Sequence, residues 1–177
     1  LIYDKSFYKF LDKNFLNIIN LKSPYIEKAI YESCKIKKSV VEKDEKENGL
    51  RKILNFGHTF AHAFEASLGF SRKLNHGEAV ILGIKTALNF SLRNSFLKKS
   101  EYKLIINHID SAGLPSSIKK FFSLKDLNKI LSFMIKDKKN NSSKINLILI
   151  KRIGKVILGS RFNEIVIKKF LIKELIN

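Results

Sequence analysis

Three of the four histidines lie close together in the sequence, at a spacing that could bind a metal ion. His58 and His62 are four residues apart, so on a helix their side chains share one face. His76 follows a short polar loop and begins the next apolar run, where a second helix would start. Imidazoles from two adjacent helices supply part of a divalent-metal site and suit zinc, cobalt or iron. A single histidine on an apolar helix face is more often a core residue, but the combination favours a metal site.

Two polar residues precede this cluster at helical spacing. Arg51, Asn55, His58 and His62 are separated by four, three and four residues, which predicts one continuous polar helical face. The residues between them are largely phenylalanine and alanine, so a solvated surface does not by itself explain this face. We therefore expect Arg51 and Asn55 to approach the same place as His58.

Apolar periodicity places these residues on a mainly α-helical fold. We expect helices over residues 4–18, 24–43, 77–92, 100–111, 123–134 and 163–175. Asp4 and Ser100 are the expected N-caps, and Pro24 is expected at a first helical position. Residues 145–150 and 155–158 predict a β-hairpin. The fold class is thus a multi-helical bundle domain, spanning residues 1–177, with one short β-hairpin near the C-terminus.

Composition fits one globular domain in a reducing compartment. The chain has 177 residues, of which 45% are hydrophobic and 28% charged. A single cysteine, Cys34, excludes an internal disulfide framework and favours a cytoplasmic protein. No apolar run approaches the ~20 residues of a membrane span, and no secretory signal is visible. Because Leu1 is not a methionine, we interpret the sequence as a piece of a longer chain.

The net charge of +18 has three interpretations. A basic chain can bind nucleic acid, or it can attract an anionic substrate. It can also reflect a genome rich in the codons for Lys, Ile, Asn and Phe. We favour the third interpretation for most of the charge, because the lysines are scattered over nearly every predicted helix. A basic helical nucleic-acid-binding module remains the non-enzyme alternative.

Taken together, these segments resemble the C-terminal domain of 3-dehydroquinate synthase, a member of the sugar-phosphate cyclase family. The resemblance rests on residues 43–65 (KDEKENGLRKILNFGHTFAHAFE) and on residues 76–80 (HGEAV). It extends to residues 34–41, 112–115 and 137–140, and to the closing hairpin and helix. The resemblance covers essentially the whole chain, and the combined motifs are far more specific than a His-x3-His pair.

The resemblance implies a cytoplasmic, homodimeric lyase of the shikimate pathway, which leads to aromatic amino acids. Such an enzyme converts 3-deoxy-D-arabino-heptulosonate 7-phosphate into 3-dehydroquinate and phosphate. The steps implied are transient oxidation by NAD, phosphate elimination, reduction and aldol cyclisation. The cofactors implied are NAD and a divalent metal, zinc or cobalt. An N-terminal NAD-binding α/β domain, which would hold most of the cofactor contacts, is expected outside this chain, so the fragment alone should be inactive.

The resemblance also assigns roles to individual residues. It implies that His58 and His76 are metal ligands, and that Lys37 and Arg51 bind the substrate carboxylate. It implies that His62, Asn55 and Lys138 face the substrate phosphate and are catalytic. A third metal ligand, a glutamate, and a nearby lysine are expected upstream of Leu1. Ala61 stands where the family commonly has glycine, which should be tolerated if no neighbouring helix presses against it.

Two other enzyme classes share this architecture. Other sugar-phosphate cyclases use the same cofactors on different substrates, and iron-type alcohol or glycerol dehydrogenases also place histidines on paired helices. The anion-binding set of Lys37, Arg51, Asn55 and Lys138 argues against a small alcohol as substrate. Among the cyclases, the pairing of Lys37 with Arg51 favours a substrate that carries an acid.

Overall fold

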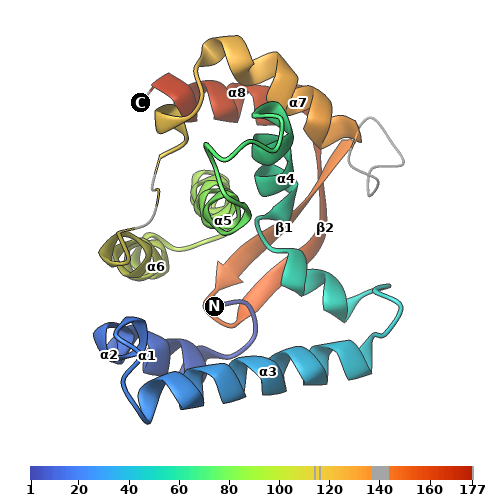
Figure 1. The fold of residues 1–177 in the computed structure, drawn as a ribbon. Coiled ribbons are helices and arrows are strands. Elements are labelled where there is room, and N and C mark those ends of the chain that lie inside the picture. The colour runs from blue at the N-terminus through green and yellow to red at the C-terminus, as the bar shows by residue number, and fades with distance from the viewer. Residues whose placement is uncertain (114, 116, 137–143, 177) are drawn as a thin grey trace.

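The computed structural model describes residues 1–113, 115, 117–136 and 144–176, and it confirms a mainly helical fold with one C-terminal hairpin (Figure 1). The α-helices are α1 (Lys5–Lys13), α2 (Phe15–Ile19), α3 (Tyr25–Lys43), α4 (His58–Ser67), α5 (His76–Arg93), α6 (Lys99–Ser111), α7 (Leu127–Lys136) and α8 (Glu164–Ile176). Short 3-10 helices are η1 (Leu50–Asn55), η2 (Ile118–Lys120) and η3 (Leu124–Asp126). The strands are β1 (Lys144–Arg152) and β2 (Lys155–Asn163).

The helix boundaries follow local capping, with three corrections to the predictions. Asp4 caps α1 as expected, accepting a hydrogen bond from the backbone N–H of Phe7 at 2.7 Å. The predicted helix 4–18 is divided, because the backbone leaves helical geometry at Asn14, whose side chain donates to the carbonyl of Phe10. Pro24 precedes α3 rather than beginning it. Ser100 is not a cap, because α6 already begins at Lys99, directly after the extended backbone of Lys98.

The hairpin ties the two central helices together. β1 and β2 pair antiparallel from Lys144 opposite Asn163 to Arg152 opposite Lys155. Thr59 on α4 donates its hydroxyl proton to a carbonyl of β1, that of Asn146, at 3.3 Å. A backbone N–H of β1, that of Ile150, donates to the hydroxyl of Ser91 on α5 at 3.2 Å. β1 therefore fixes α4 and α5 in one arrangement.

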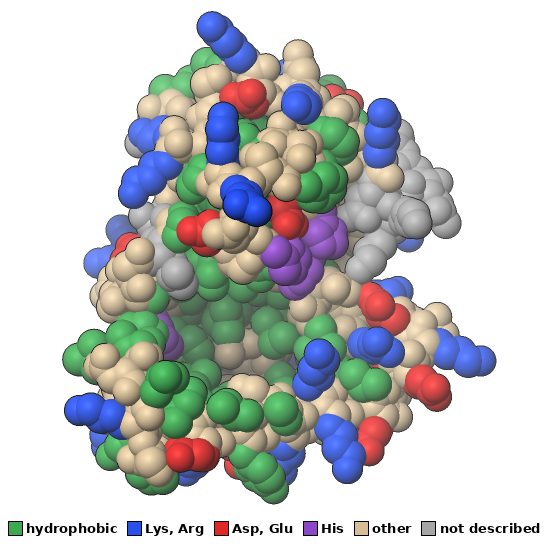
Figure 2. Space-filling view, in the orientation of Figure 1, with side chains coloured by type: hydrophobic (Ala, Val, Ile, Leu, Met, Phe, Trp, Pro, Cys, Tyr) green, Lys and Arg blue, Asp and Glu red, His purple; other side chains and the backbone are tan. Residues whose placement is uncertain are grey.

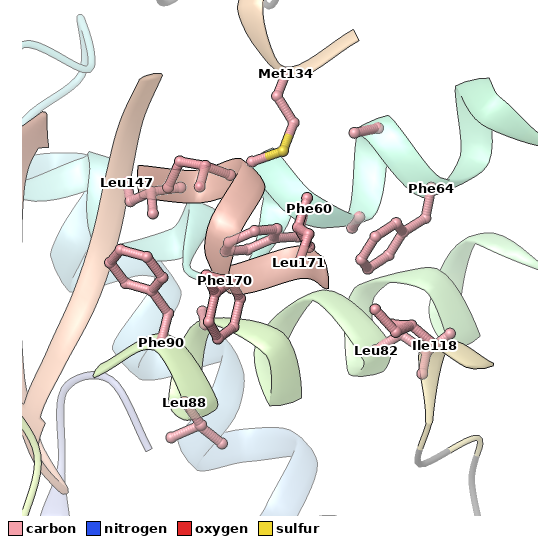
Figure 3. Packing of buried hydrophobic residues seen from close by; sticks show 14 of the residues in the cluster. Phe60, Phe64, Leu82, Leu88, Phe90, Ile118, Met134, Leu147, Phe170 and Leu171 are labelled. Atoms are coloured by element: carbon pink, nitrogen blue, oxygen red, sulfur yellow. The ribbon is translucent and has the colours of Figure 1, made fainter. Parts of the chain in front are cut away.

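A cluster of phenylalanines fills the space between α4, α5 and α8 (Figure 3). The ring of Phe170 on α8 lies with its centroid 6.2 Å from that of Phe60 on α4 and 5.0 Å from that of Phe90 on α5. Phe60 and Phe90 are essentially inaccessible to solvent. Burying large aromatic side chains is among the strongest stabilising contributions a small domain has. This core therefore holds the helices that carry the histidines.

α3 is a long helix that contributes little to this core. It runs along the bottom of Figure 1, and only Ala29 and Val40 of its residues are buried. Lys37 is therefore exposed on a helix beside the core.

Among the helices that the structure describes, α3 included, none has both the length and the apolar character needed to cross a lipid bilayer.

α4 and α5 cross at unusually close range. A Cβ atom added at Gly83 of α5 would lie 2.8 Å from the backbone nitrogen of Ala61 and 3.0 Å from its Cβ. One added at Gly57, just before α4, would lie 2.5 Å from the backbone nitrogen of Ile84. Alanine at position 61 was expected to be tolerated only if no neighbouring helix pressed against it. The structure shows that α5 does press against Ala61, which is fully buried. The alanine fits because Gly83 has no side chain.

Replacing Gly83 with alanine should lower the free energy of unfolding by about 1–3 kcal/mol, because the added methyl forces the two helix backbones apart. Chemical denaturation of the purified protein would measure the change. Gly77→Ala is the matched control on the same helix, because an added Cβ there meets nothing within 4 Å. A Gly83→Ala variant as stable as the Gly77→Ala variant would contradict the close approach.

Candidate functional site

The histidine cluster begins at a turn that only a glycine accommodates well. Gly57 has φ +83°, a left-handed conformation, and it separates η1 from α4. The buried side chain of Phe56 anchors the turn, and a ring nitrogen of His58, Nδ1, lies 3.4 Å from its carbonyl oxygen. His58 is consequently the first residue of α4.

The structure brings the three predicted histidines together. The ring centroid of His58 lies 5.5 Å from that of His62 and 6.4 Å from that of His76. His76 is the first residue of α5, as expected from the sequence. Because imidazole nitrogen binds zinc at about 2.0–2.1 Å, two rings at this separation can share one ion. At 6.4 Å the rings of His58 and His76 are near the outer limit for sharing one ion, so a tetrahedral site would draw them closer together.

A buried carboxylate holds His76, and the sequence analysis assigned it no role. Nδ1 of His76 lies 3.0 Å and 3.1 Å from the two carboxylate oxygens of Glu65 on α4. The side chain of Glu65 is 11% exposed, whereas that of His76 is 66% exposed. This contact leaves Nε2 of His76 for a ligand, which is the usual arrangement of a metal-binding histidine. The signal in the sequence was a lone glutamate among alanine and phenylalanine, one turn after His62.

Zinc and cobalt both accept imidazole ligands, and His58 and His76 offer two, the second held by a carboxylate. These two ligands do not complete a coordination shell. In the part of the chain that the structure describes, no three His, Cys, Asp or Glu side chains are placed to hold one ion. Any ion held by His58 and His76 would need further ligands from outside this set.

The predicted polar face over residues 51–62 is wrong as a single helix. η1 ends at Asn55, and the left-handed Gly57 redirects the chain before α4 begins. The side-chain amide of Asn55 donates to Glu47 at 2.6 Å, and the guanidinium of Arg51 donates to the carbonyl of Glu45 at 2.7 Å. Both residues are thus oriented by the turn between α3 and η1, not by helical continuity with the histidines.

Of the two predicted lysines, the structure describes Lys37 but not Lys138. Lys37 lines a pocket of about 350 Å³ between the N-terminal segment and α3, with Leu54, next to Asn55, on the facing side. Figure 2 shows the molecule hollowed between the α3 arm and the body, with an apolar floor and histidines at its margin. Lys138 lies outside the described residues, so its predicted place beside the phosphate keeps the status of a prediction.

Asp44 organises the turn that carries Arg51. Its carboxylate accepts hydrogen bonds from the backbone N–H groups of Asn48, Gly49 and Arg51, at 2.8–2.9 Å. The N–H groups of Arg51 and Gly49 contribute most to a lowered pKa of the Asp44 carboxyl, because they favour its ionised form. The folded turn therefore depends on an ionised Asp44.

The family model and the curated relatives that match this chain belong to the same enzyme family. The model of the family described as 3-dehydroquinate synthase C-terminal matches residues 1–140. The 3-dehydroquinate synthase of Pelagibacter ubique is 62% identical over 175 residues, which are 99% of this chain and 48% of that protein. That of Acetivibrio thermocellus is 39% identical over 171 residues, which are 96% of this chain and 46% of that protein. The chain spans about half the length of the curated relatives it matches.

Solved structures share the fold at low sequence identity. A 2-epi-5-epi-valiolone synthase from Streptomyces hygroscopicus, with NAD+ and Zn2+ bound, superposes with a TM-score of 0.81 at 15% identity, covering 98% of this chain and 47% of its own. A 2-deoxy-scyllo-inosose synthase complexed with carbaglucose-6-phosphate, NAD+ and Co2+ superposes with a TM-score of 0.68 at 22% identity, covering 87% and 42%. These superpositions show that the chain shares the fold of those domains.

Replacing Asp44 with alanine should destabilise the protein at neutral pH, because three backbone N–H groups lose their acceptor. Since the folded-state pKa is lowered, the stabilisation is present above the unfolded pKa of about 3.9 and is lost as the pH falls through the lowered folded value. Thermal unfolding of variant and wild type should therefore converge in acid. Glu45→Ala, which removes an exposed charge from the same turn, is the control and should leave the midpoint nearly unchanged.

Proposed function

The chain belongs to the 3-dehydroquinate synthase C-terminal family, and from this premise we propose that it forms the helical half of a 3-dehydroquinate synthase. The reaction is conversion of 3-deoxy-D-arabino-heptulosonate 7-phosphate to 3-dehydroquinate and phosphate. The other half of the enzyme is an NAD-binding α/β domain, in line with the half-length coverage of the relatives. The whole enzyme is a cytoplasmic homodimer.

One observation supports the site assignment above the others. The first residues of α4 and α5, His58 and His76, lie with ring centroids 6.4 Å apart, and the buried Glu65 holds the second ring. An isolated surface histidine needs no buried carboxylate partner, whereas a metal ligand gains orientation and basicity from one. In this proposal His58 and His76 hold zinc or cobalt, and the half outside this chain supplies a further ligand.

When bound, NAD would supply hydride chemistry, and a metal ion held by His58 and His76 would supply Lewis-acid chemistry. The chain's own residues bind and orient the substrate. Arg51 uses one guanidinium nitrogen on the carbonyl of Glu45, so its other donors can form a bidentate pair with the substrate carboxylate. Lys37 adds a second positive charge from α3.

Phosphate elimination places negative charge on the leaving group, and three residues are proposed to stabilise that charge. Asn55 donates one amide hydrogen to Glu47 and keeps a second amide hydrogen for a ligand. His62 has an exposed ring on the same face of α4 as His58, where it can donate a proton or a hydrogen bond to the departing phosphate. Lys138 completes the set as a point charge. Donors fixed before the reaction stabilise the developing charge without reorganisation.

A second candidate is cyclisation of a related sugar phosphate, the class to which the solved neighbours belong. The two candidates differ in the substrate carboxylate, which only Lys37 and Arg51 would recognise here. Turnover of the keto-acid phosphate compared with a sugar phosphate lacking the acid group separates them. Equal efficiency on both substrates would favour the second candidate.

In the full-length enzyme, His58→Ala should remove most of the bound metal and lower turnover by at least about a thousandfold, because it deletes a ligand. Metal content by elemental analysis and phosphate release would measure both effects. His108→Gln is the control, because His108 lies on α6, packed against Tyr8 and Phe15 away from the cluster. Wild-type metal content in the His58→Ala variant would show that the ligand assignment is wrong.

Glu65→Gln should lower zinc affinity about tenfold while leaving the metal site assembled, because an amide can still accept from His76 but adds no charge. Competition with a chelator measures this affinity without reference to turnover. Glu42→Gln, an exposed change on α3, is the matched control. If both variants bind zinc equally well, Glu65 has no part in holding the metal.

A further inference from the structure

A second polar pocket lies on the far half of α5, away from the histidines. Its volume is about 250 Å³, and it forms where α5, α8 and the segment around η2 meet. Four cationic residues line it: Lys85, Arg93, Lys119 and Lys173. Lys85 follows His76 by nine residues on one helix, about 13 Å along the axis. This pocket is therefore separate from the candidate metal site.

Two of the cations are held by carboxylates, of which Glu174 lines the pocket and Asp110 lies outside it. The guanidinium of Arg93 pairs with Glu174 on α8 at 2.8 Å, and the ammonium of Lys85 pairs with Asp110 on α6 at 2.7 Å. Glu174 also accepts from the side-chain amide of Asn89, whose oxygen in turn accepts from the hydroxyl of Tyr102 at 2.6 Å. These contacts give each carboxylate oxygen of Glu174 and the amide oxygen of Asn89 a donor within the protein, and they orient the side chains of the wall.

The other two cations have no such partner. Within the described residues, no carboxylate lies within ion-pair distance of Lys119 or Lys173. Ser117 accepts from the backbone N–H of Lys119 at 3.3 Å, which leaves its hydroxyl proton for another acceptor. Lys85 and Arg93 keep donors beyond those in their ion pairs. The groups left for a ligand are therefore almost entirely hydrogen-bond donors.

We propose that this pocket binds a small phosphate-bearing molecule or inorganic phosphate. A donor-only, cationic wall is complementary to an acceptor-rich anion, and lysine and arginine are the residues that proteins use for phosphate. The apolar side chains of Leu82 and Ile118 form the rest of the wall and strengthen its electrostatic field by excluding water. The volume lies just below the range of drug-sized pockets, which fits a phosphate or a short phosphate monoester.

Binding of inorganic phosphate to the full-length protein tests the proposal. The measurement uses a background carrying Asn55→Ala, His62→Ala and Lys138→Ala, which removes the three residues proposed to bind phosphate at the histidine site. Isothermal titration at fixed ionic strength then reports the second site alone. Adding Lys119→Ala and Lys173→Ala should weaken phosphate binding about tenfold or more, because two charge-assisted contacts are lost.

Lys103→Ala with Lys129→Ala is the matched control, since both lysines are exposed, neither lines the pocket, and the pair removes the same total charge. Phosphate affinity in this control should change less than twofold. Equal weakening by both pairs would show a diffuse charge effect and overturn the proposal, as would no weakening by the pocket pair. With Asn55, His62 and Lys138 intact, the pocket pair should leave basal turnover unchanged, so failure of the proposed function and failure of this proposal remain distinguishable.

Discussion

The close crossing of α4 and α5 is the constraint on which the candidate site depends. Each helix begins with one of the two histidines proposed as ligands, so the distance between their rings is set by how closely the helices approach. Gly57 and Gly83 permit that approach, because side chains at either position would meet the opposite backbone. The phenylalanine core and β1 then hold the arrangement. Larger residues at the crossing would move the rings apart without touching them.

Much of this could be predicted from the sequence. Apolar periodicity predicted α3, α5 and α8 nearly to their ends, because buried faces repeat regularly along each element. It also located the hairpin, but β2 continues to Asn163, well beyond the predicted end at residue 158. The histidine cluster followed from a four-residue spacing and a helix start. The face joining Arg51 and Asn55 to the histidines was wrong, because spacing cannot reveal one left-handed glycine between two helical turns. Glu65 was missed because its partner lies eleven residues away and meets it only in three dimensions.

The polar groups of the site lie on two kinds of structure, namely packed helices and an exposed turn. The histidines begin packed helices, and Glu65 is buried beneath one of them. Arg51 and Asn55 are instead oriented by the Asp44 turn, through hydrogen bonds that depend on exposed or half-buried carboxylates. In the proposed enzyme, the metal ligands and His62 would therefore stay fixed, while Arg51 adjusts to the substrate carboxylate. Rigid metal geometry and adaptable anion contacts are compatible demands on one domain.

The positions of His58 and His76 at the first residues of α4 and α5 have an electrostatic consequence. The peptide dipoles of a helix sum to roughly half a positive charge at its N-terminus. Two such ends meet at the same cluster, so an approaching anion is attracted there by the backbone itself. These dipoles belong to the peptide backbone, so side-chain substitutions leave them in place. The attraction would therefore persist in relatives with far fewer lysines than this chain, whatever the base composition of their genomes.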